Sequence, residues 1–125
     1  SDQVAECGGR IAGKPGGLEK ARQQLQAFSG KTVNFLSAFA IVREKTGFVF
    51  ERTVTTEVAF RLLTDLEIDR YLERDQPFDC AGSFRSEANG PALLERMRSD
   101  DPTAIMGLPL IELARGLRQG GLLLP

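Results

Sequence analysis

Apolar residues near the start of the chain follow a helical period. They recur every three or four positions, at Leu18, Ala21, Leu25 and Phe28. This spacing places side chains along one face of a helix, and Gly30 is a residue type common at helix C-termini. The pattern predicts a helix over residues 18–28. Before it, two short extended segments are expected over residues 4–7 and 10–12, around a Gly-Gly turn.

Two longer apolar segments follow. Residues 32–43 are apolar at nearly every position, which is typical of a central strand covered on both faces. Residues 48–60 alternate between apolar and polar side chains, as a half-buried strand does. Because a Lys-Thr-Gly turn separates the two segments, we expect them to pair as an antiparallel hairpin.

The second half of the chain carries helix signals at two places. Thr64 and Glu67 have the spacing of a capping box. They predict a helix over residues 65–74 that buries Ile68, Tyr71 and Leu72. Pro109 stands where a second helix opens, since proline is favoured in a first turn. The side chains expected to face inward from it are Leu110, Leu113, Ala114 and Leu117. Between the helices, residues 93–98 are expected to form a strand.

These elements predict an α/β fold with a mixed, largely antiparallel sheet flanked by helices. The glycine-rich phosphate fingerprint of doubly wound nucleotide folds is absent from the sequence. A length of 125 residues and a hydrophobic fraction of 42% are enough for one domain with its own core. We therefore expect residues 1–125 to form a single domain.

Composition narrows the classes of partner. Sixteen basic and seventeen acidic residues give a net charge of -1, whereas a sequence-independent nucleic-acid binder needs a basic excess. No apolar run approaches the ~20 residues that cross a bilayer. We therefore expect neither a nucleic-acid nor a membrane partner. The two cysteines, Cys7 and Cys80, are far apart, which favours a reduced, cytoplasmic protein, and Cys80 is interpreted as a packed thiol.

Residues able to hold and cut a nucleoside triphosphate occur in three separate segments. Asp2 and Gln3 lie at the start, Lys14 lies between a glycine and a proline, and Glu87 follows Ser-Phe-Arg-Ser. Because the chain has no histidine, general acid/base work must fall to carboxylates, lysines, Tyr71 or a metal-bound water. A lysine in a turn offers a point charge to a phosphate oxygen. Each residue also has a simpler interpretation, as a frayed terminal acid, a solvated lysine or a loop acid.

Further motifs follow in order along the chain: Ser29-Gly30-Lys31-Thr32, Phe60-Arg61, Glu67-Ile68, Asp79-Cys80-Ala81-Gly82 and Gly107-Leu108-Pro109-Leu110. With the three segments above, they resemble the Maf family of septum-formation-type nucleoside triphosphate pyrophosphatases over nearly the whole chain. The resemblance implies a fold similar to inosine triphosphate pyrophosphatases and hydrolysis of a nucleoside triphosphate to the monophosphate and pyrophosphate. It also implies a divalent cation, Mg²⁺ or Mn²⁺, as cofactor and a homodimer.

The resemblance further implies roles for individual residues. Asp2 is expected to act as general base and to bind the metal, and Lys14 to bind phosphate. Gln3 and Glu87 are expected to read the base. A guanine edge presents two adjacent hydrogen-bond donors to a carboxylate, and methylation at N7 adds a positive charge.

Other matched positions have more than one interpretation. Asp79 and Ser83 are assigned to the substrate site, where they support the loop or contact phosphate. Phe84 either stacks on the base or packs in the core, and core packing is favoured. Arg61 and Lys31 either serve the site or pair with carboxylates at the surface.

Two sequence styles in the family separate substrate classes. Members with a Ser-Asp-Gln motif and a Ser-Phe-(Lys/Arg)-Ser-Glu loop act on 7-methyl-GTP. This chain resembles them at Gln3 and Glu87. The other style acts on dTTP and UTP. That activity is one alternative, and a catalytically incomplete nucleotide-binding remnant or a protein acting by association in cell division are others. Because the family's Ser-Ser-X-Arg phosphate loop is absent, we expect an N-terminally truncated chain, the C-terminal two thirds of the family fold.

Overall fold

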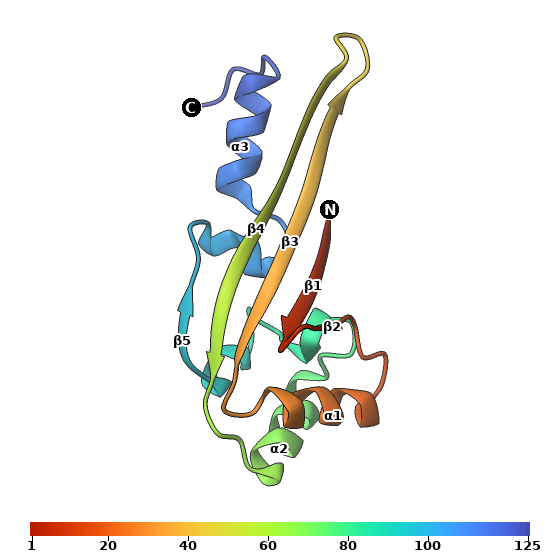
Figure 1. Ribbon diagram of the computed structural model, residues 1–125, viewed down its shortest axis with the longest axis vertical. Helices are drawn as coiled ribbons and strands as arrows, with labels where there is room; N and C mark the ends of the chain where they lie inside the picture. The colour runs from red at the N-terminus through yellow and green to blue at the C-terminus, as the bar shows by residue number, and fades with distance from the viewer.

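Figure 1 shows the computed structural model, which describes residues 1–125. The strands are β1 (Asp2–Cys7), β2 (Arg10–Ala12), β3 (Thr32–Arg43), β4 (Phe48–Phe60) and β5 (Leu94–Arg98). The α-helices are α1 (Leu18–Phe28), α2 (Asp65–Asp75) and α3 (Leu110–Gln119). Three 3-10 helices are η1 (Ala81–Ser83), η2 (Gly90–Leu93) and η3 (Pro102–Met106). No helix of the chain combines the length and the apolar character that crossing a membrane requires.

The five strands form one sheet in the order β2-β1-β3-β4-β5, and every neighbouring pair is antiparallel. β3 and β4 pair along their full length, from Thr32 opposite Ala59 to Arg43 opposite Phe48. β1 reaches only as far as Ala38 of β3, so the hairpin extends well beyond it (Figure 1). The predicted hairpin and the predicted sheet with flanking helices are confirmed.

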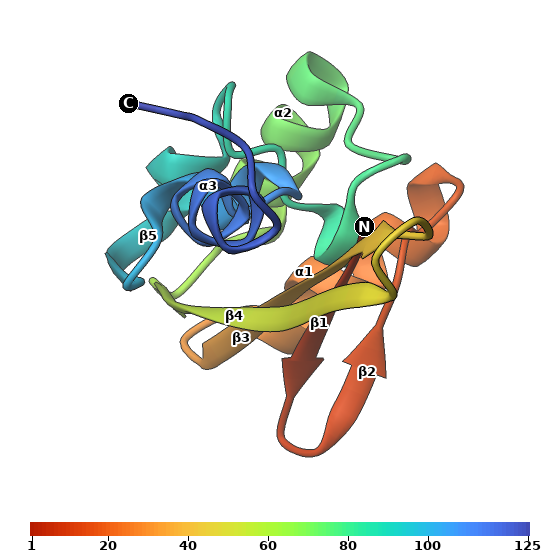
Figure 2. The ribbon, with the colours of Figure 1, turned by 90° about the horizontal axis from the view of Figure 1, so that it is seen from above.

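The helices cover only one face of this sheet. Leu25 of α1 belongs to the same buried cluster as Phe35 of β3, and Gly116 of α3 faces Ile41 and Phe50 on the same side of the hairpin. Figure 2 shows α2 and α3 on one side of the β3–β4 ribbon.

The prediction that β3 is covered on both faces is therefore wrong. On the uncovered face Ala38 is half-buried, Ala40 is exposed and Val42 is 64% exposed. The strand register gives the reason, because Ala38 lies opposite Thr53 and Ala40 lies opposite Glu51. The neighbouring strand thus contributes polar side chains to the same face, and the apolar residues of β3 there do not make a second core.

The main core lies between the sheet and the helices α1 and α2. Leu25 and Phe28 are buried in it, and the ring of Phe28 lies 5.6 Å from that of Phe60. Burying side chains of this size contributes roughly 1.5–3 kcal/mol each. Leu18, predicted on the same stripe, is 50% exposed, because it begins α1 one turn before the first buried residue, Ala21.

Helix α3 is held less tightly. Gly116 is its only buried residue, and Leu110, predicted to face inward, is 51% exposed at the first position of the helix. The other three residues predicted to face inward are half-buried. Arg52 helps to hold the helix, because its guanidinium lies 4.2 Å from the centre of the Phe50 ring and 3.7 Å from the carboxylate of Glu112.

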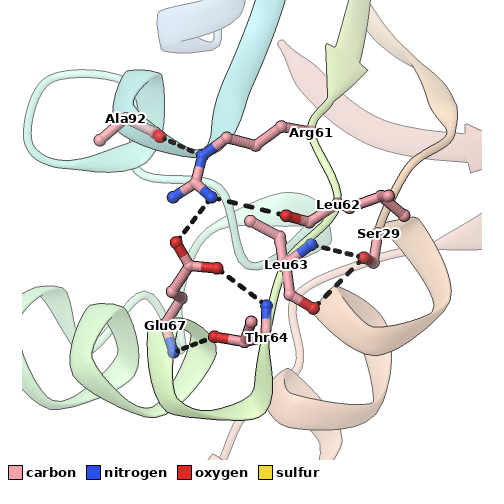
Figure 3. Close-up of polar contacts among 7 residues, drawn as sticks. All are labelled: Ser29, Arg61, Leu62, Leu63, Thr64, Glu67 and Ala92. Atoms are coloured by element: carbon pink, nitrogen blue, oxygen red, sulfur yellow. Dashed lines mark hydrogen bonds and ion pairs between the residues drawn. The ribbon is translucent and has the colours of Figure 1, made fainter.

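A polar joint ties the end of α1 to the start of α2 and to η2 (Figure 3). The predicted capping box is present: the N–H of Glu67 donates to Thr64 Oγ1 at 3.2 Å, and the N–H of Thr64 donates to Glu67 Oε1 at 2.9 Å. Arg61 donates to Glu67 Oε2 at 2.7 Å and to the carbonyl of Ala92 at 3.0 Å. Ser29 is the C-cap residue of α1, and its Oγ accepts the backbone N–H of Leu63, in the β4–α2 connection, at 2.7 Å. Arg61 thus pairs with a carboxylate, as one of its two interpretations predicted.

Candidate functional site

Five of the six predicted site residues border one cleft of about 300 Å³. It lies where the start of β1, the loop before α1, the segment around η1 and the end of η3 meet. The predicted residues that line it are Asp2, Gln3, Lys14, Asp79 and Glu87. The sixth predicted residue, Ser83, does not line this cleft.

Backbone hydrogen bonds place Lys14 beside the segment around η1. The N–H of Gly16 donates to the carbonyl of Phe78 at 3.0 Å, and the N–H of Gly82 donates to the carbonyl of Gly13 at 3.1 Å. Lys14 lies between these two contacts, is exposed, and forms no ion pair within the protein. Its ammonium group is therefore available to an anionic ligand in the cleft.

Gly82 permits this close approach of η1 to the core. Its φ of +61° lies in the left-handed region, which favours glycine. A Cβ at this position would lie 2.9 Å from the Cβ of Ala5 and 3.2 Å from the rings of Phe28 and Phe35. Any larger residue would push η1, and the cleft wall it forms, away from the sheet.

Gln3 joins β1 to η3 inside the cleft. Its amide nitrogen donates to Ser37 Oγ at 3.0 Å, to the carbonyl of Ala104 at 3.2 Å and to the carbonyl of Ile105 at 3.1 Å. The hydroxyl of Ser37, fully buried, donates to the same Ala104 carbonyl at 2.7 Å. The nitrogen of Gln3 is therefore committed to the protein, which leaves its amide oxygen as the atom able to accept from a ligand.

Two buried polar side chains of α2 hold the loop that follows η1. The hydroxyl of Tyr71 donates to the carbonyl of Ser83 at 2.6 Å and accepts the N–H of Arg85 at 2.9 Å. One turn later, the carboxylate of Asp75 accepts the backbone N–H of Asn89 at 2.7 Å and its side-chain amide at 2.6 Å. Burial raises the pKa of Tyr71, so its hydroxyl stays a neutral donor. The loop is thus fixed at two points on either side of Glu87.

Glu87 itself is only lightly engaged. Its side chain is 54% exposed, its Oε1 lies 3.9 Å from Arg85 Nη1, and its Oε2 accepts the hydroxyl of Ser86 at 3.3 Å. An ion pair this long and this exposed stabilises little. The carboxylate can therefore exchange these contacts for contacts with a ligand, while the backbone on both sides of it stays fixed.

Three other residues at η1 have structural contacts. Ser83 is buried, and its hydroxyl donates to the side-chain oxygen of Gln24 at 2.6 Å. The ring of Phe84 lies 5.4 Å from that of Phe35 and is 5% exposed, which confirms core packing over base stacking. Burial raises the pKa of Cys80, which agrees with its interpretation as a packed thiol.

Comparison with known proteins assigns the family. The family model described as Maf-like protein matches residues 1–120 of the chain. The chain belongs to the Maf family. The resemblance inferred from its motifs is therefore confirmed, and the α/β fold agrees with it.

Three relatives in the Maf family bear the name 7-methyl-GTP pyrophosphatase. One from Aromatoleum aromaticum is 54% identical over 125 residues, which cover all of this chain and 64% of the relative. One from Cupriavidus pinatubonensis is 51% identical over 121 residues, covering 97% of this chain and 61% of the relative. One from Xanthomonas axonopodis pv. citri is 49% identical over 125 residues, covering all of this chain and 65% of the relative. The chain thus spans less than two thirds of the length of each of these relatives.

The divalent cation implied by the family can be tested against the side chains of the cleft. No three metal-ligating side chains converge anywhere in the chain. Mg²⁺ at nucleotide sites, however, commonly takes only one or two carboxylates and completes its shell with phosphate oxygens and water. Asp2 is exposed and borders the cleft, and the one protein hydrogen bond of its carboxylate is from the N–H of Gln3 at 2.9 Å. The carboxylate of Asp2 therefore fits as one of the one or two carboxylate ligands that such a Mg²⁺ ion takes.

The residues that support the Maf cleft from behind were not predicted from the sequence. Asp75 and Gln24 received no role, and Tyr71 was not expected to support the loop. A signal was present, because Tyr71 and Asp75 lie four residues apart and so share one face of the predicted helix. Polar groups on the buried face of a helix require partners, and here those partners belong to the loop that follows η1.

Proposed function

We propose that the protein is a nucleoside triphosphate pyrophosphatase that converts 7-methyl-GTP and water into 7-methyl-GMP and pyrophosphate. The observation that carries this proposal is the meeting of Asp2, Lys14 and Glu87 on one cleft, from segments far apart in the sequence. The choice of substrate is supported by relatives with 49–54% sequence identity to the chain, each named 7-methyl-GTP pyrophosphatase.

Hydrolysis needs a water molecule that loses a proton as it attacks phosphorus. In this proposal the carboxylate of Asp2 accepts that proton while the water oxygen bonds to the α-phosphorus. The bond from the α-phosphorus to the oxygen that bridges the α- and β-phosphates breaks. Pyrophosphate leaves with the bridging oxygen. The ammonium of Lys14 stabilises the negative charge that builds up on the phosphate oxygens, a contribution that depends on position more than on covalent chemistry.

A divalent cation, Mg²⁺ or Mn²⁺, is part of this proposal. When bound, it neutralises charge on the triphosphate. Asp2 is the residue that would hold it, together with oxygens of the substrate. Asp79, also exposed on the cleft, is the second carboxylate we assign to the phosphate end of the site.

The base is read by Glu87 and Gln3. Two adjacent N–H donors on the guanine edge match the two oxygens of the Glu87 carboxylate, and the positive charge of the 7-methyl base adds an attraction. Uracil and thymine lack that pair of donors. In this proposal the amide oxygen of Gln3, which has no protein partner, accepts a further hydrogen bond from the substrate.

The setting of the enzyme is also part of the proposal. We propose a cytoplasmic homodimer. The dimer is supported by the family resemblance, and the compartment by two free cysteines, Cys7 and Cys80. The balanced charge of the chain supports a nucleotide substrate without a nucleic-acid partner.

The proposal is tested by pyrophosphate release from 7-methyl-GTP, GTP, dTTP and UTP with Mg²⁺ or Mn²⁺. We expect 7-methyl-GTP to be hydrolysed fastest. Asp2→Asn should lower its rate by about 100-fold or more, because a positioned base typically contributes that much. Glu87→Gln should reduce the preference for 7-methyl-GTP over UTP by about tenfold, the equivalent of one charge-assisted hydrogen bond. Glu95→Gln, an equally conservative change on the exposed face of β5, is the matched control.

Each part of the proposal has its own contrary result. Full activity of Asp2→Asn would remove Asp2 from the role of base. A preference for dTTP or UTP in the unaltered protein would overturn the substrate. No hydrolysis of any of the four nucleotides would overturn enzymatic activity for this chain and leave a nucleotide-binding remnant as the better description.

A further inference from the structure

A cavity of about 650 Å³ lies apart from the candidate cleft. It lies between the β1–β2 hairpin and α1, which are neighbours in Figure 1. Binding sites for small molecules typically measure roughly 300–1,000 Å³. The cavity, which we name the basic cavity, is therefore of a size to hold a small ligand.

The side chains of the basic cavity carry charge of one sign. Arg10 of β2, Lys20 of α1 and Lys31 after α1 all line it, and no acidic residue does. None of these three cations takes part in any ion pair of the protein, although five arginines elsewhere do. In a chain whose net charge is -1, such a gathering of unpaired positive charge favours an anionic ligand.

The remaining walls favour a compact ligand with hydrogen-bond acceptors. Gln23 and Gln24 line the cavity with side-chain amides, and Ala27 and Phe28 give it an apolar side. Three cations from three different segments suit an anion that carries several charges along its length. A single carboxylate has only one charge to share among them. An oligophosphate has both the charge and the acceptor oxygens.

We propose that the basic cavity is a second anion site, which binds an oligophosphate through Arg10, Lys20 and Lys31. The inference is independent of the proposed enzymatic function. The site shares a wall with the candidate cleft, because the amide of Gln24 donates to the carbonyl of Gly13, next to Lys14, at 3.1 Å.

The test measures binding of inorganic triphosphate without metal, by calorimetry and by shifts of backbone amide NMR signals. In the unaltered protein, we expect shifts at residues 20–31 as well as any at residues 79–87. The double variant Lys20→Ala/Lys31→Ala should lose the shifts at residues 20–31 and bind at that site about tenfold more weakly per cation removed. Lys14→Ala should keep them. Lys45→Ala, in the exposed β3–β4 turn, is the matched control.

Three results would overturn the proposal: no shift at residues 20–31 in the unaltered protein, equal shifts there in the double variant, or loss of those shifts in Lys14→Ala. Far-ultraviolet circular dichroism shows whether the double variant is folded. If it is not, the NMR shifts of the unaltered protein still test the site. Repeating the titration with GTP separates the sources of the phosphate. Equal affinity for triphosphate and GTP identifies the phosphate chain as the ligand, and failure of both to bind contradicts the site.

Discussion

The two ends of the β3–β4 hairpin are packed in different ways. At the end near α1 and α2, Val33 lies opposite Val58, and both are fully buried. At the far end the same face carries Ile41, which is half-buried, and the side chain of Arg52, which is 47% exposed. One end is stabilised by a contiguous apolar core, and the other by one short helix and a separate pair of buried rings, Phe39 and Phe50.

This difference bears on the candidate cleft, because the cleft lies between the two ends. Its η1 wall is rooted in the core through Gly82 and Phe84. Its η3 wall is attached to α3 through Asp101, a buried carboxylate. We infer that the η1 wall is the rigid one and that the η3 wall has the stability of α3.

The same substitution at two glycines tests the contrast most strongly. Gly82→Ala combines a left-handed φ with contacts to the Cβ of Ala5 and to two packed rings, so we expect a loss of about 3 kcal/mol. At Gly116 the backbone is helical, and the added Cβ would lie 2.5 Å from the Phe50 ring and 2.7 Å from Ile41 Cδ1. Overpacking without left-handed backbone strain should cost less, about 2 kcal/mol. Urea denaturation of both variants measures this, and equal losses would contradict the difference between the two ends.

Removal of the Asp101 carboxylate should give the next largest effect. Asp101→Ala leaves the N–H groups of Ile111 and Glu112 without the acceptor that lies 2.9 and 3.1 Å away. We expect a loss of about 2 kcal/mol, the upper end for a helix cap. Hydrogen exchange should rise in α3 and η3, while the amides of α1 stay protected. Unchanged hydrogen exchange in η3 would show that the stability of this wall does not depend on α3.

The pH dependence of this cap follows from the same contacts. Burial by itself acts to raise the pKa of Asp101, but hydrogen bonds from Thr103, Glu112 and Ile111 outweigh it and lower the pKa. A lowered pKa gives stability that is present above the ordinary value of about 4 and is lost as pH falls through the lowered one. Between roughly pH 5 and pH 2, the free energy of unfolding should therefore fall less in Asp101→Ala than in the unaltered protein.

The hydroxyl of Tyr71 tests the rigid wall with a smaller change. Tyr71→Phe leaves the carbonyl of Ser83 and the N–H of Arg85 unpaired, so we expect a loss of about 1 kcal/mol. The amide of Arg85 should exchange faster with solvent. Discrimination between 7-methyl-GTP and UTP should decline more than the overall rate, because the loop around Glu87 loosens while Asp2 is untouched. Equal decline for both nucleotides would contradict a positioning role.

The smallest effect is expected at the joint between α1 and α2. The backbone N–H of Thr64, with help from Arg61, holds the pKa of Glu67 at about 2. Its contribution to stability is therefore present above the ordinary value of about 4.3 and disappears as pH falls toward 2. NMR titration of the Glu67 carboxyl should show this low value, and Arg61→Ala should raise it. An unchanged value in Arg61→Ala would assign the shift to the capping box alone.

Local patterns predicted the elements well, since turns and breakers bound them. Residues 18–28, 32–43 and 48–60 have the expected bounds because their periods are uninterrupted and glycine-rich turns separate them. What covers each face was not predictable from one strand. The exposure of Ala40 depends on Glu51, its neighbour only in the paired register.

The candidate site divides in the same way. Motifs identified the residues that border the cleft, because Asp2, Lys14 and Glu87 lie in recognisable short segments. The contacts that support them join distant positions, such as Gln3 with Ile105 and Tyr71 with Ser83. No local pattern encodes those pairs, and η3, which supplies one wall, was not predicted at all.

The bonds from Gln3 to η3 also bear on how the chain folds. They join Gln3 to residues that lie 101 and 102 positions further along the chain. Contacts at such separations require the closure of a long loop before they stabilise the fold. The β3–β4 hairpin, by contrast, closes over the four residues between Arg43 and Phe48. We therefore expect the hairpin to form early and the cleft to be completed last, so that a folding intermediate holds most of the core before it can hold a ligand.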